Sequence, residues 1–152
     1  MSRRSIVALA AILLVVLAVR GFRDPAESAK VTAARIADDE AKAHAAWKAI
    51  RASSGPTWDA AEVERVEREV LPPWSEARRR VEAARSGPDG RFFPPELEEF
   101  FRLREESWVA LIEAVRQNDA ERFNEHAELF KKAEEVGELV RSGRQPVVTL
   151  GR

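Results

Sequence analysis

Residues 97–123 read LEEFFRLREESWVALIEAVRQNDAERF, and this stretch decides the fold class. Its apolar residues recur every three or four positions, which is the spacing of one face of an amphipathic α-helix. Asn118-Asp-Ala-Glu121 then has a capping-box pattern and predicts a second helix start directly after the first. Two helices joined by so tight a turn are antiparallel neighbours. The first stripe consists of Leu97, Phe101, Arg104, Trp108, Leu111 and Val115, widened by Phe100 and Ile112.

Three further stretches of the chain have apolar residues at the same helical spacing. One follows Asp24-Pro25, an N-cap residue with proline at the first helical position, and stops at Ser53-Ser-Gly-Pro56. Another follows Asp59, which begins a capping-box pattern with Glu62. The last one follows the turn at residue 118. In chain order the stripes are Ala29, Ala33, Ile36, Ala43, Trp47 and Ile50; Val63, Val66, Val70, Trp74, Ala77, Val81 and Ala84; and Phe123, Ala127, Phe130, Ala133, Gly137 and Val140.

Four one-sided helices of this length bury their apolar faces most simply against one another, in an antiparallel bundle. Pro72-Pro73 lies inside the second helix and predicts either a sharp kink there or two collinear segments. The predicted fold is therefore all-α. It has an N-terminal membrane-anchor or signal helix over residues 1–23, a four-helix bundle over 24–143 with its second helix kinked, and a loose tail over 144–152.

The N-terminal segment has the composition of an export signal. A short basic start is followed by fourteen apolar residues without a charge, Ile6 to Val19, which is the pattern of a secretory signal or a signal anchor. Fourteen helical residues span about 21 Å, less than the roughly 30 Å of a bilayer core, but a snorkelling Arg20 extends the reach. Because the cleavage signals are poor, we expect an uncleaved anchor that contacts membrane lipid through residues 5–22. A cleaved signal peptide is the alternative.

The location of the bundle depends on the orientation of this segment. Arginines lie on both sides of the apolar run, and their count alone would keep the C-terminal part in the cytoplasm. Long domains, however, translocate largely regardless of charge, and we favour a bundle in the periplasm or outside the cell. Twenty Arg against five Lys fits a GC-rich bacterial genome. The expected location is the bacterial inner membrane, with a single pass; a soluble periplasmic protein is the alternative.

Composition excludes several classes of function. The chain has no cysteine, which removes disulfides, thiol catalysis, Cys-ligated zinc and iron–sulfur clusters. Its formal net charge of −1 argues against a nucleic-acid partner. The phosphate-loop, dinucleotide and nucleophile-elbow motifs are missing. Because Glu-x-x-His and a second methionine are also missing, di-iron and Met-ligated haem sites are excluded. We therefore predict no catalytic residues and no cofactor.

Polar residues on the apolar stripes are the remaining candidates for a site. Glu40 and Arg104 each replace an expected apolar side chain. They are predicted either to form a buried pair that fixes the register of the bundle or to lie at a wet end of it. The two histidines, His44 and His126, lie at stripe edges and are weak metal candidates, together with Glu40 or Glu125. The alternative is that both are boundary residues between core and solvent.

Tryptophans and one basic cluster complete the set of candidates. Trp47, Trp74 and Trp108 occupy stripe positions, which predicts core packing or an interhelical aromatic groove for a small molecule or peptide. Arg78-Arg-Arg80 and Arg85 have acids among them. They predict a solvated face with intrahelical ion pairs, the alternative being a lipid-headgroup or nucleic-acid contact.

These observations favour a non-catalytic function. The chain is predicted to be a membrane-anchored, extracytoplasmic helical bundle that acts as a protein-interaction or scaffold module for a partner in the cell envelope. Its anchor would raise its effective concentration for partners at the membrane. The alternative is a cleaved, soluble periplasmic protein that holds a small ligand or a metal between its helices.

Overall fold

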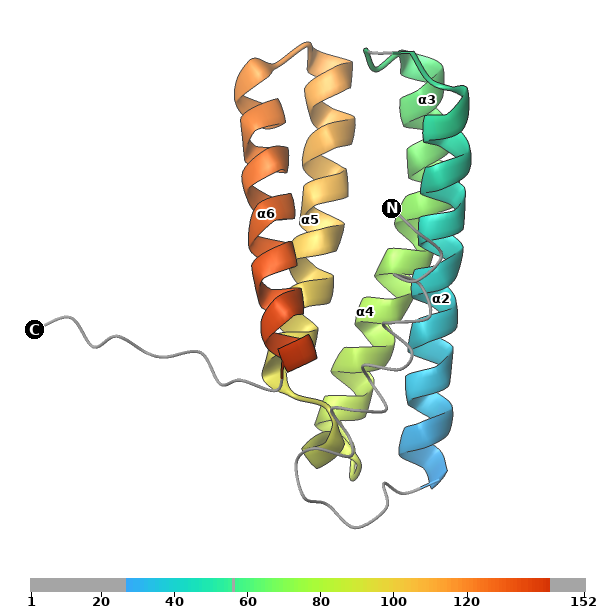
Figure 1. The fold of residues 1–152 in the computed structure, drawn as a ribbon, viewed down its shortest axis with the longest axis vertical. Coiled ribbons are helices and arrows are strands. Elements are labelled where there is room, and N and C mark those ends of the chain that lie inside the picture. The colour runs from blue at the N-terminus through green and yellow to red at the C-terminus, as the bar shows by residue number, and fades with distance from the viewer. Residues whose placement is uncertain (1–26, 56, 143–152) are drawn as a thin grey trace, which may run out of the picture.

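The computed structural model describes residues 27–55 and 57–142 of the 152-residue chain, and all regular structure in these two ranges is helical (Figure 1). The predicted all-α class is thereby confirmed, and the arrangement is consistent with a helical bundle. The predicted leader over residues 1–23 and the predicted tail over 144–152 lie outside the described residues.

The helical segments form four rods, and successive rods run in opposite directions (Figure 1). The second rod is built from three successive segments, and a short 3₁₀ turn precedes the third rod. In chain order the segments are α2 (Glu27–Ser53), α3 (Ala60–Arg65), the π-helical turn η1 (Val66–Val70), α4 (Leu71–Ser86), η2 (Gly90–Phe92), α5 (Pro95–Gln117) and α6 (Ala120–Ser142).

The second rod passes through its two prolines without ending. Pro72 and Pro73 have no backbone N–H, so the carbonyl groups one turn earlier lose their usual donors. The chain accommodates them with the wider turn η1, in which the Leu71 N–H donates to the Val66 carbonyl five residues back. The prolines then occupy the first turn of α4, which is the part of a helix where proline is tolerated best.

Capping explains where two of the helices begin. The predicted capping box at Asp59 is confirmed, because its carboxylate accepts from the Glu62 N–H at 2.8 Å and its own N–H donates to the Glu62 carboxylate at 3.0 Å. The predicted box at Asn118 is wrong by one residue. Asn118 closes α5 in a left-handed conformation, with φ at 50°, and Asp119 instead accepts from the Glu121 N–H at 2.8 Å. Asparagine tolerates that conformation better than most residues do.

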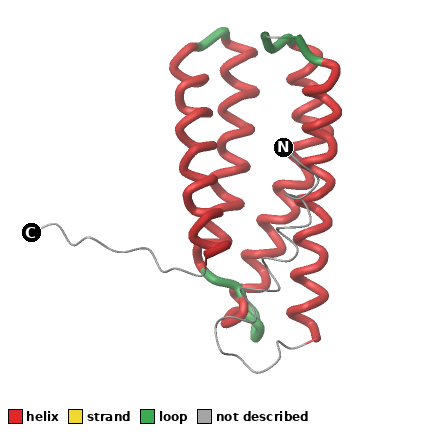
Figure 2. Tube along the Cα trace, in the orientation of Figure 1, coloured by secondary structure: helices red, strands yellow, loops and turns green. Residues whose placement is uncertain are grey.

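Neighbouring rods pack in chain order. The closest packing joins α5 to α6, followed by α2 to α4 and α4 to α5. Within the described ranges, α2 and α6 make no extensive backbone contact with each other, and the two pairs of rods stand apart at one end (Figures 1 and 2). Side chains fill the space between α2 and α5, because Trp47 of α2 lies with its ring centroid 4.7 Å from that of Trp108.

The core contains most of the predicted stripes, with one clear error in α6. Ala127, predicted to be buried, is exposed. Because α6 packs extensively on α5 alone, its buried face is narrow and consists of Ala133, Gly137 and Val140. At Gly137 the two helices approach closely, since an added Cβ would lie 3.2 Å from the ring of Phe100.

Candidate functional site

A layer of charged side chains lies in the interior, between α2 on one side and the α5–α6 pair on the other. Glu40 of α2 is 4% exposed and Arg104 of α5 is 5% exposed. Each lies on the face of its helix that carries the core residues, and it is buried because that face packs inward. The structure thus places both side chains inside the protein and not at a wet end. Arg104 forms an ion pair with Glu134, which lies on a third helix, α6.

Aromatic rings enclose the Arg104 guanidinium. Its central carbon lies 4.0 Å from the ring centroid of Phe130, 5.5 Å from that of Phe100 and 5.8 Å from that of Trp74. A cation over an aromatic face is stabilised by the ring's quadrupole, more so when it is desolvated. The guanidinium is therefore held both by a carboxylate and by three rings, and it connects α4, α5 and α6.

Burial and charge set the protonation of this layer. Burial lowers the pKa of Arg104 to about 10; the negative charge of Glu40 opposes this lowering, and the positive charge of Arg141 adds to it. The ion pair with Glu134 also favours the charged form. Arg104 consequently remains a cation at neutral pH, and the interior of the protein holds a permanent charge.

Three polar atoms of this layer have no hydrogen-bond partner among the described residues. They are Oε1 of Glu40, Nε of Arg104 and Nε1 of Trp108. The Nε2 atom of His44 lies 3.7 Å from Glu40 Oε1, which is too far for a hydrogen bond. A buried donor or acceptor left unpaired costs about 1–3 kcal/mol, and more when the group is charged. Packing alone therefore does not explain why these polar groups occupy core positions.

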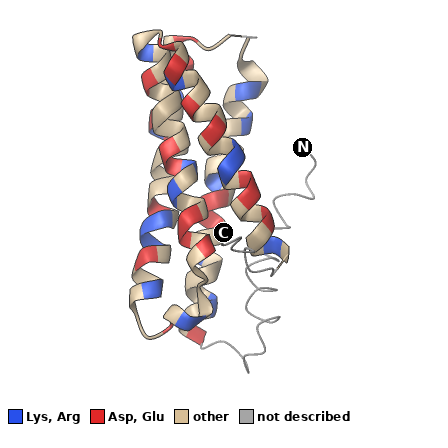
Figure 3. Ribbon diagram, turned by 90° about the vertical axis from the view of Figure 1, so that its left-hand side faces the viewer, with Lys and Arg blue, Asp and Glu red and all other residues tan. Residues whose placement is uncertain are grey.

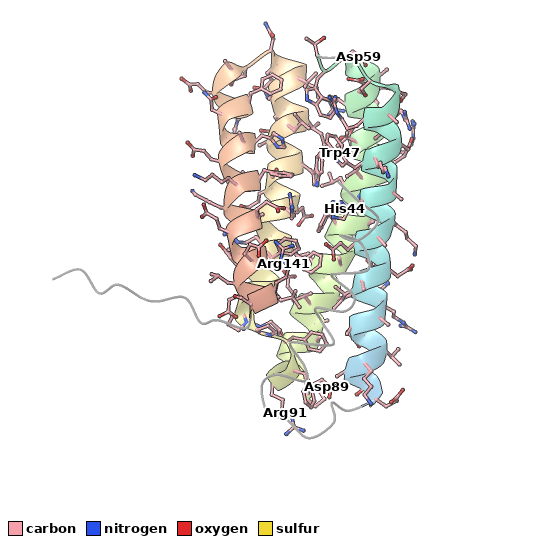
Figure 4. All side chains as sticks on the ribbon, in the orientation of Figure 1. His44, Trp47, Asp59, Asp89, Arg91 and Arg141 are labelled. Carbon is pink, nitrogen blue, oxygen red and sulfur yellow. The ribbon has the colours of Figure 1, made fainter. Side chains whose placement is uncertain are left out.

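The two histidines have different neighbours. The ring of His44 lies edge-on to Trp74, at 5.6 Å between centroids, and points toward the interior (Figure 4). In His126 the Nδ1 atom lies 2.8 Å from the carbonyl oxygen of Ser107. Burial lowers the pKa of His126; the bond to the Ser107 carbonyl opposes this lowering, and the charge of Arg104 adds to it. Residues 27–55 and 57–142 contain no group of three side chains that could hold a metal ion.

The three predicted tryptophans make different aromatic contacts. Trp74 is buried against Phe101 and the Arg104 guanidinium, whereas Trp108 contacts Trp47 nearer the end of the rods. The half-buried Trp47 ring also stacks on Trp58, at 5.3 Å between centroids. The indoles therefore flank the charged layer on two sides.

Sequence reasoning missed two members of this region. Glu134 belongs to the pair Glu134-Glu135, and two adjacent acids in a helix are typical of a solvated face. Its position four residues after Phe130 was the available signal, since this spacing places both on one flank of the helix. Trp58 lies in the loop before α3, outside every helical stripe, and its sequence context carries no such signal.

The predicted basic cluster is neutralised within the fold. Arg78 pairs with Glu105 of α5 at 2.8 Å, and Arg80 pairs with Asp39 of α2 at 2.7 Å. Two of the arginines thus connect α4 to both of its neighbours. Within α4, Arg78 also pairs with Glu82, and Arg79 and Arg80 both pair with Glu76, while Arg85 pairs with Glu98 of α5.

Comparison with protein-family models, with curated proteins and with solved structures finds no match to this chain. In the ranges that the structure describes, no helix combines the length and the apolar character needed to cross a bilayer.

Proposed function

We propose that the protein is a membrane-anchored, non-catalytic helical module that positions a partner at the cell envelope. In this proposal residues 24–143 form an antiparallel four-helix bundle, bent in its second rod at Pro72-Pro73. The anchor is the N-terminal segment, with the bundle in the periplasm or outside the cell. The observation that carries the proposal is the uncharged apolar run Ile6 to Val19 behind two arginines.

The surface of the described residues supports a module that works in water. Acids and bases alternate along the rods on the face drawn in Figure 3. Ion pairs join neighbouring rods at several places, as between Arg116 and Glu67 at 2.5 Å. Such a surface is well hydrated. In this proposal the chain therefore attaches to a membrane through its apolar N-terminal segment.

The buried layer supports a non-catalytic function. Catalysis requires polar groups that converge on a place where a substrate can react. Here Arg104 is bound to Glu134 and enclosed by rings, and His126 is bound to Ser107. These groups mainly hold helices to one another.

Fractionation with protease accessibility tests the proposal on the full chain expressed in a Gram-negative host. We expect the intact chain in the inner-membrane fraction, protected in whole cells and digested in spheroplasts. Replacing Leu13→Arg and Leu14→Arg together should release the chain from the membrane, because each charge at the centre of a span costs about 2.5–3.5 kcal/mol. The matched pair Leu13→Val and Leu14→Val should leave it there.

The same experiment identifies the competing function. A soluble periplasmic chain that begins at residue 19 or 22 would contradict the anchor and support a cleaved binding protein. The three unpaired atoms in the charged layer favour that second function. Resistance to protease in spheroplasts would contradict the proposed sidedness and indicate a stalk that faces the cytoplasm.

A further inference from the structure

A surface groove lies at the end of the bundle where α5 begins and α6 finishes (Figure 1). It has a volume of about 540 Å³, is open to solvent, and has a mainly apolar lining. Covering such a lining removes apolar side chains from water, which is favourable. We call it the end groove. Its apolar lining residues are Pro95, Val136 and Leu139, and its acidic ones are Glu96, Glu98 and Glu99.

The acids of the end groove differ in their partners. Glu98 and Glu99 each pair with an arginine, and the arginine at Glu99 is shared with a further glutamate. Glu96 pairs with no basic side chain within residues 27–55 and 57–142, and one of its carboxylate oxygens has no hydrogen-bond partner there. Arg141, at the end of α6, is itself paired with Glu138. Carboxylates are therefore in excess at the groove, and this excess favours a cationic occupant.

The segment that follows α6 has the complementary composition. Residues 143–152 read GRQPVVTLGR, with two arginines, three large aliphatic residues and no acid. They continue from α6, whose last residue lies about 5 Å along the helix axis from Leu139 and about 9 Å from Val136, at roughly 1.5 Å per residue. Gly143 is the residue type that most often follows a helix end and lets a chain turn back. Seven extended residues span roughly 23 Å, which is long enough to cover both side chains.

We propose that residues 144–152 bind in the end groove of the same chain as an internal ligand. The three aliphatic residues of the segment cover Val136 and Leu139, and one of its arginines supplies the cation that Glu96 lacks. While the segment is bound, the groove is closed to other molecules, so the segment is an autoinhibitory cover of this surface. The binding does not depend on whether residues 1–23 anchor the chain.

The covalent link makes a weak interaction sufficient. A segment on a short flexible linker has an effective concentration of about 1 mM at a neighbouring site. With a Kd of about 0.1 mM for the free peptide, the attached segment would occupy the groove in about ten of every eleven molecules. A separate peptide of the same sequence would then bind the wild type about tenfold more weakly than a chain whose own segment cannot bind.

A fluorescently labelled peptide of residues 143–152 tests this competition by anisotropy, with the full chain in a mild detergent. The triple variant Val147→Asp, Val148→Asp, Leu150→Asp should leave the groove empty. We expect it to bind the peptide about tenfold more tightly than the wild type does, or more. A control peptide with the same three substitutions should bind neither chain.

Further substitutions in the triple variant locate the binding. Leu139→Asp should weaken peptide binding by about tenfold or more, because it places a charge in the apolar contact. Val109→Asp, at an exposed valine of α5 outside the groove, should leave the affinity unchanged. Glu96→Gln should weaken binding about two- to fivefold, as expected for the loss of one ion pair, whereas Glu128→Gln, at an exposed acid of α6, should not.

The proposal is overturned by any of three results. The peptide fails to bind the triple variant below about 1 mM, the wild type binds it as tightly as the triple variant does, or folded Leu139→Asp binds it like its parent. If Leu139→Asp does not fold by circular dichroism, Val136→Asp replaces it. Equal affinities in Glu96→Gln and Glu128→Gln would overturn the ion pair proposed for Glu96.

Discussion

Helices α5 and α6 are each 23 residues long and pack on each other more closely than any other pair, yet α5 buries eleven residues and α6 buries three. The difference follows from the number of neighbours. Among the helices that the structure describes, α5 also contacts the α3–η1–α4 rod, whereas α6 packs extensively on α5 alone. A helix with several neighbours becomes part of the core, and a helix with one neighbour remains an attachment to it. The sequence pattern that makes both helices amphipathic does not predict how many neighbouring helices each of them has.

The charged layer has the same asymmetry. Arg104 of α5 is buried, whereas its partner Glu134 of α6 is nearly half exposed. Removal of Glu134 leaves the buried Arg104 guanidinium with the charge of Glu40 still acting on it, while removal of Arg104 leaves Glu40 buried without that compensating charge. We therefore expect the same chemical change to have unequal effects on the two helices.

Truncation of phenylalanines gives the largest expected difference. Phe101→Ala on α5 removes a ring that is fully buried and should lower the free energy of unfolding by about 3–5 kcal/mol. Phe123→Ala on α6 removes a ring that is half-buried and should cost only about 1 kcal/mol. Urea unfolding of the full chain in mild detergent measures both. Equal losses would show that α6 belongs to the core as fully as α5.

The charged layer provides the next test. Arg104→Met should destabilise the protein by about 3 kcal/mol, because Glu40 is left buried without a compensating charge. Adding Glu40→Met should restore stability to near or above the wild type, because an apolar pair needs no desolvation of charge. Glu134→Gln on α6 should cost less, about 1–2 kcal/mol, because the amide oxygen can still accept from the buried Arg104 guanidinium although the counter-charge is lost. A double variant no more stable than Arg104→Met would contradict the coupling of these residues.

The close approach at Gly137 tests how tightly α6 is attached. Gly137→Leu should cost about 1–3 kcal/mol, because its side chain meets the ring of Phe100. Ala127→Leu, on the exposed side of the same helix, should change stability by less than about 0.5 kcal/mol. Hydrogen exchange should show faster exchange in α6 than in α5 for Gly137→Leu. Similar effects of the two substitutions would contradict the narrow contact described for α6.

The smallest expected effect is a pH dependence in the contact of α6 with α5. The folded-state pKa of His126 lies below its ordinary value of 6.5, chiefly because the ring is buried. The folded state then binds fewer protons than the unfolded chain. Its stability is complete above about pH 6.5 and decreases as the pH falls toward the lowered pKa. Urea unfolding at a series of pH values measures this effect. His126→Gln should remove this part of the pH dependence of the free energy of unfolding, whereas His44→Gln should retain it.

Most of the fold could be predicted because it depends on local patterns. The helical stripes, the cap at Asp59 and the tight turn after α5 follow from spacing and from the chemistry of single residues. The errors occur where the tertiary arrangement decides. Ala127 is exposed because no further helix within residues 27–55 and 57–142 covers that side of α6, and the π-helical turn before Pro72 is one of several ways to accommodate two prolines.

The charged layer could be predicted only in part. Glu40 and Arg104 stand out in the sequence because each interrupts an apolar stripe. Their partners do not stand out, since Glu134 has the sequence context of an exposed acid and the ring of Phe130 reads as ordinary core. Which helix supplies the counter-charge depends on the rotation of α6 about its own axis. The residue pattern within one helix does not specify that rotation.

The sequence by itself determined the helices, their order, most of their buried faces and the two charged residues within those faces. Each of these follows from side-chain spacing along a single helix, where the geometry is fixed by 3.6 residues per turn. Only the tertiary structure decided that α6 packs extensively on just one of the described helices, that Glu134 pairs with Arg104, and that Glu40 and Arg104 are both buried. These features depend on how separate helices are placed in space, and that placement is set by the packing of the whole chain.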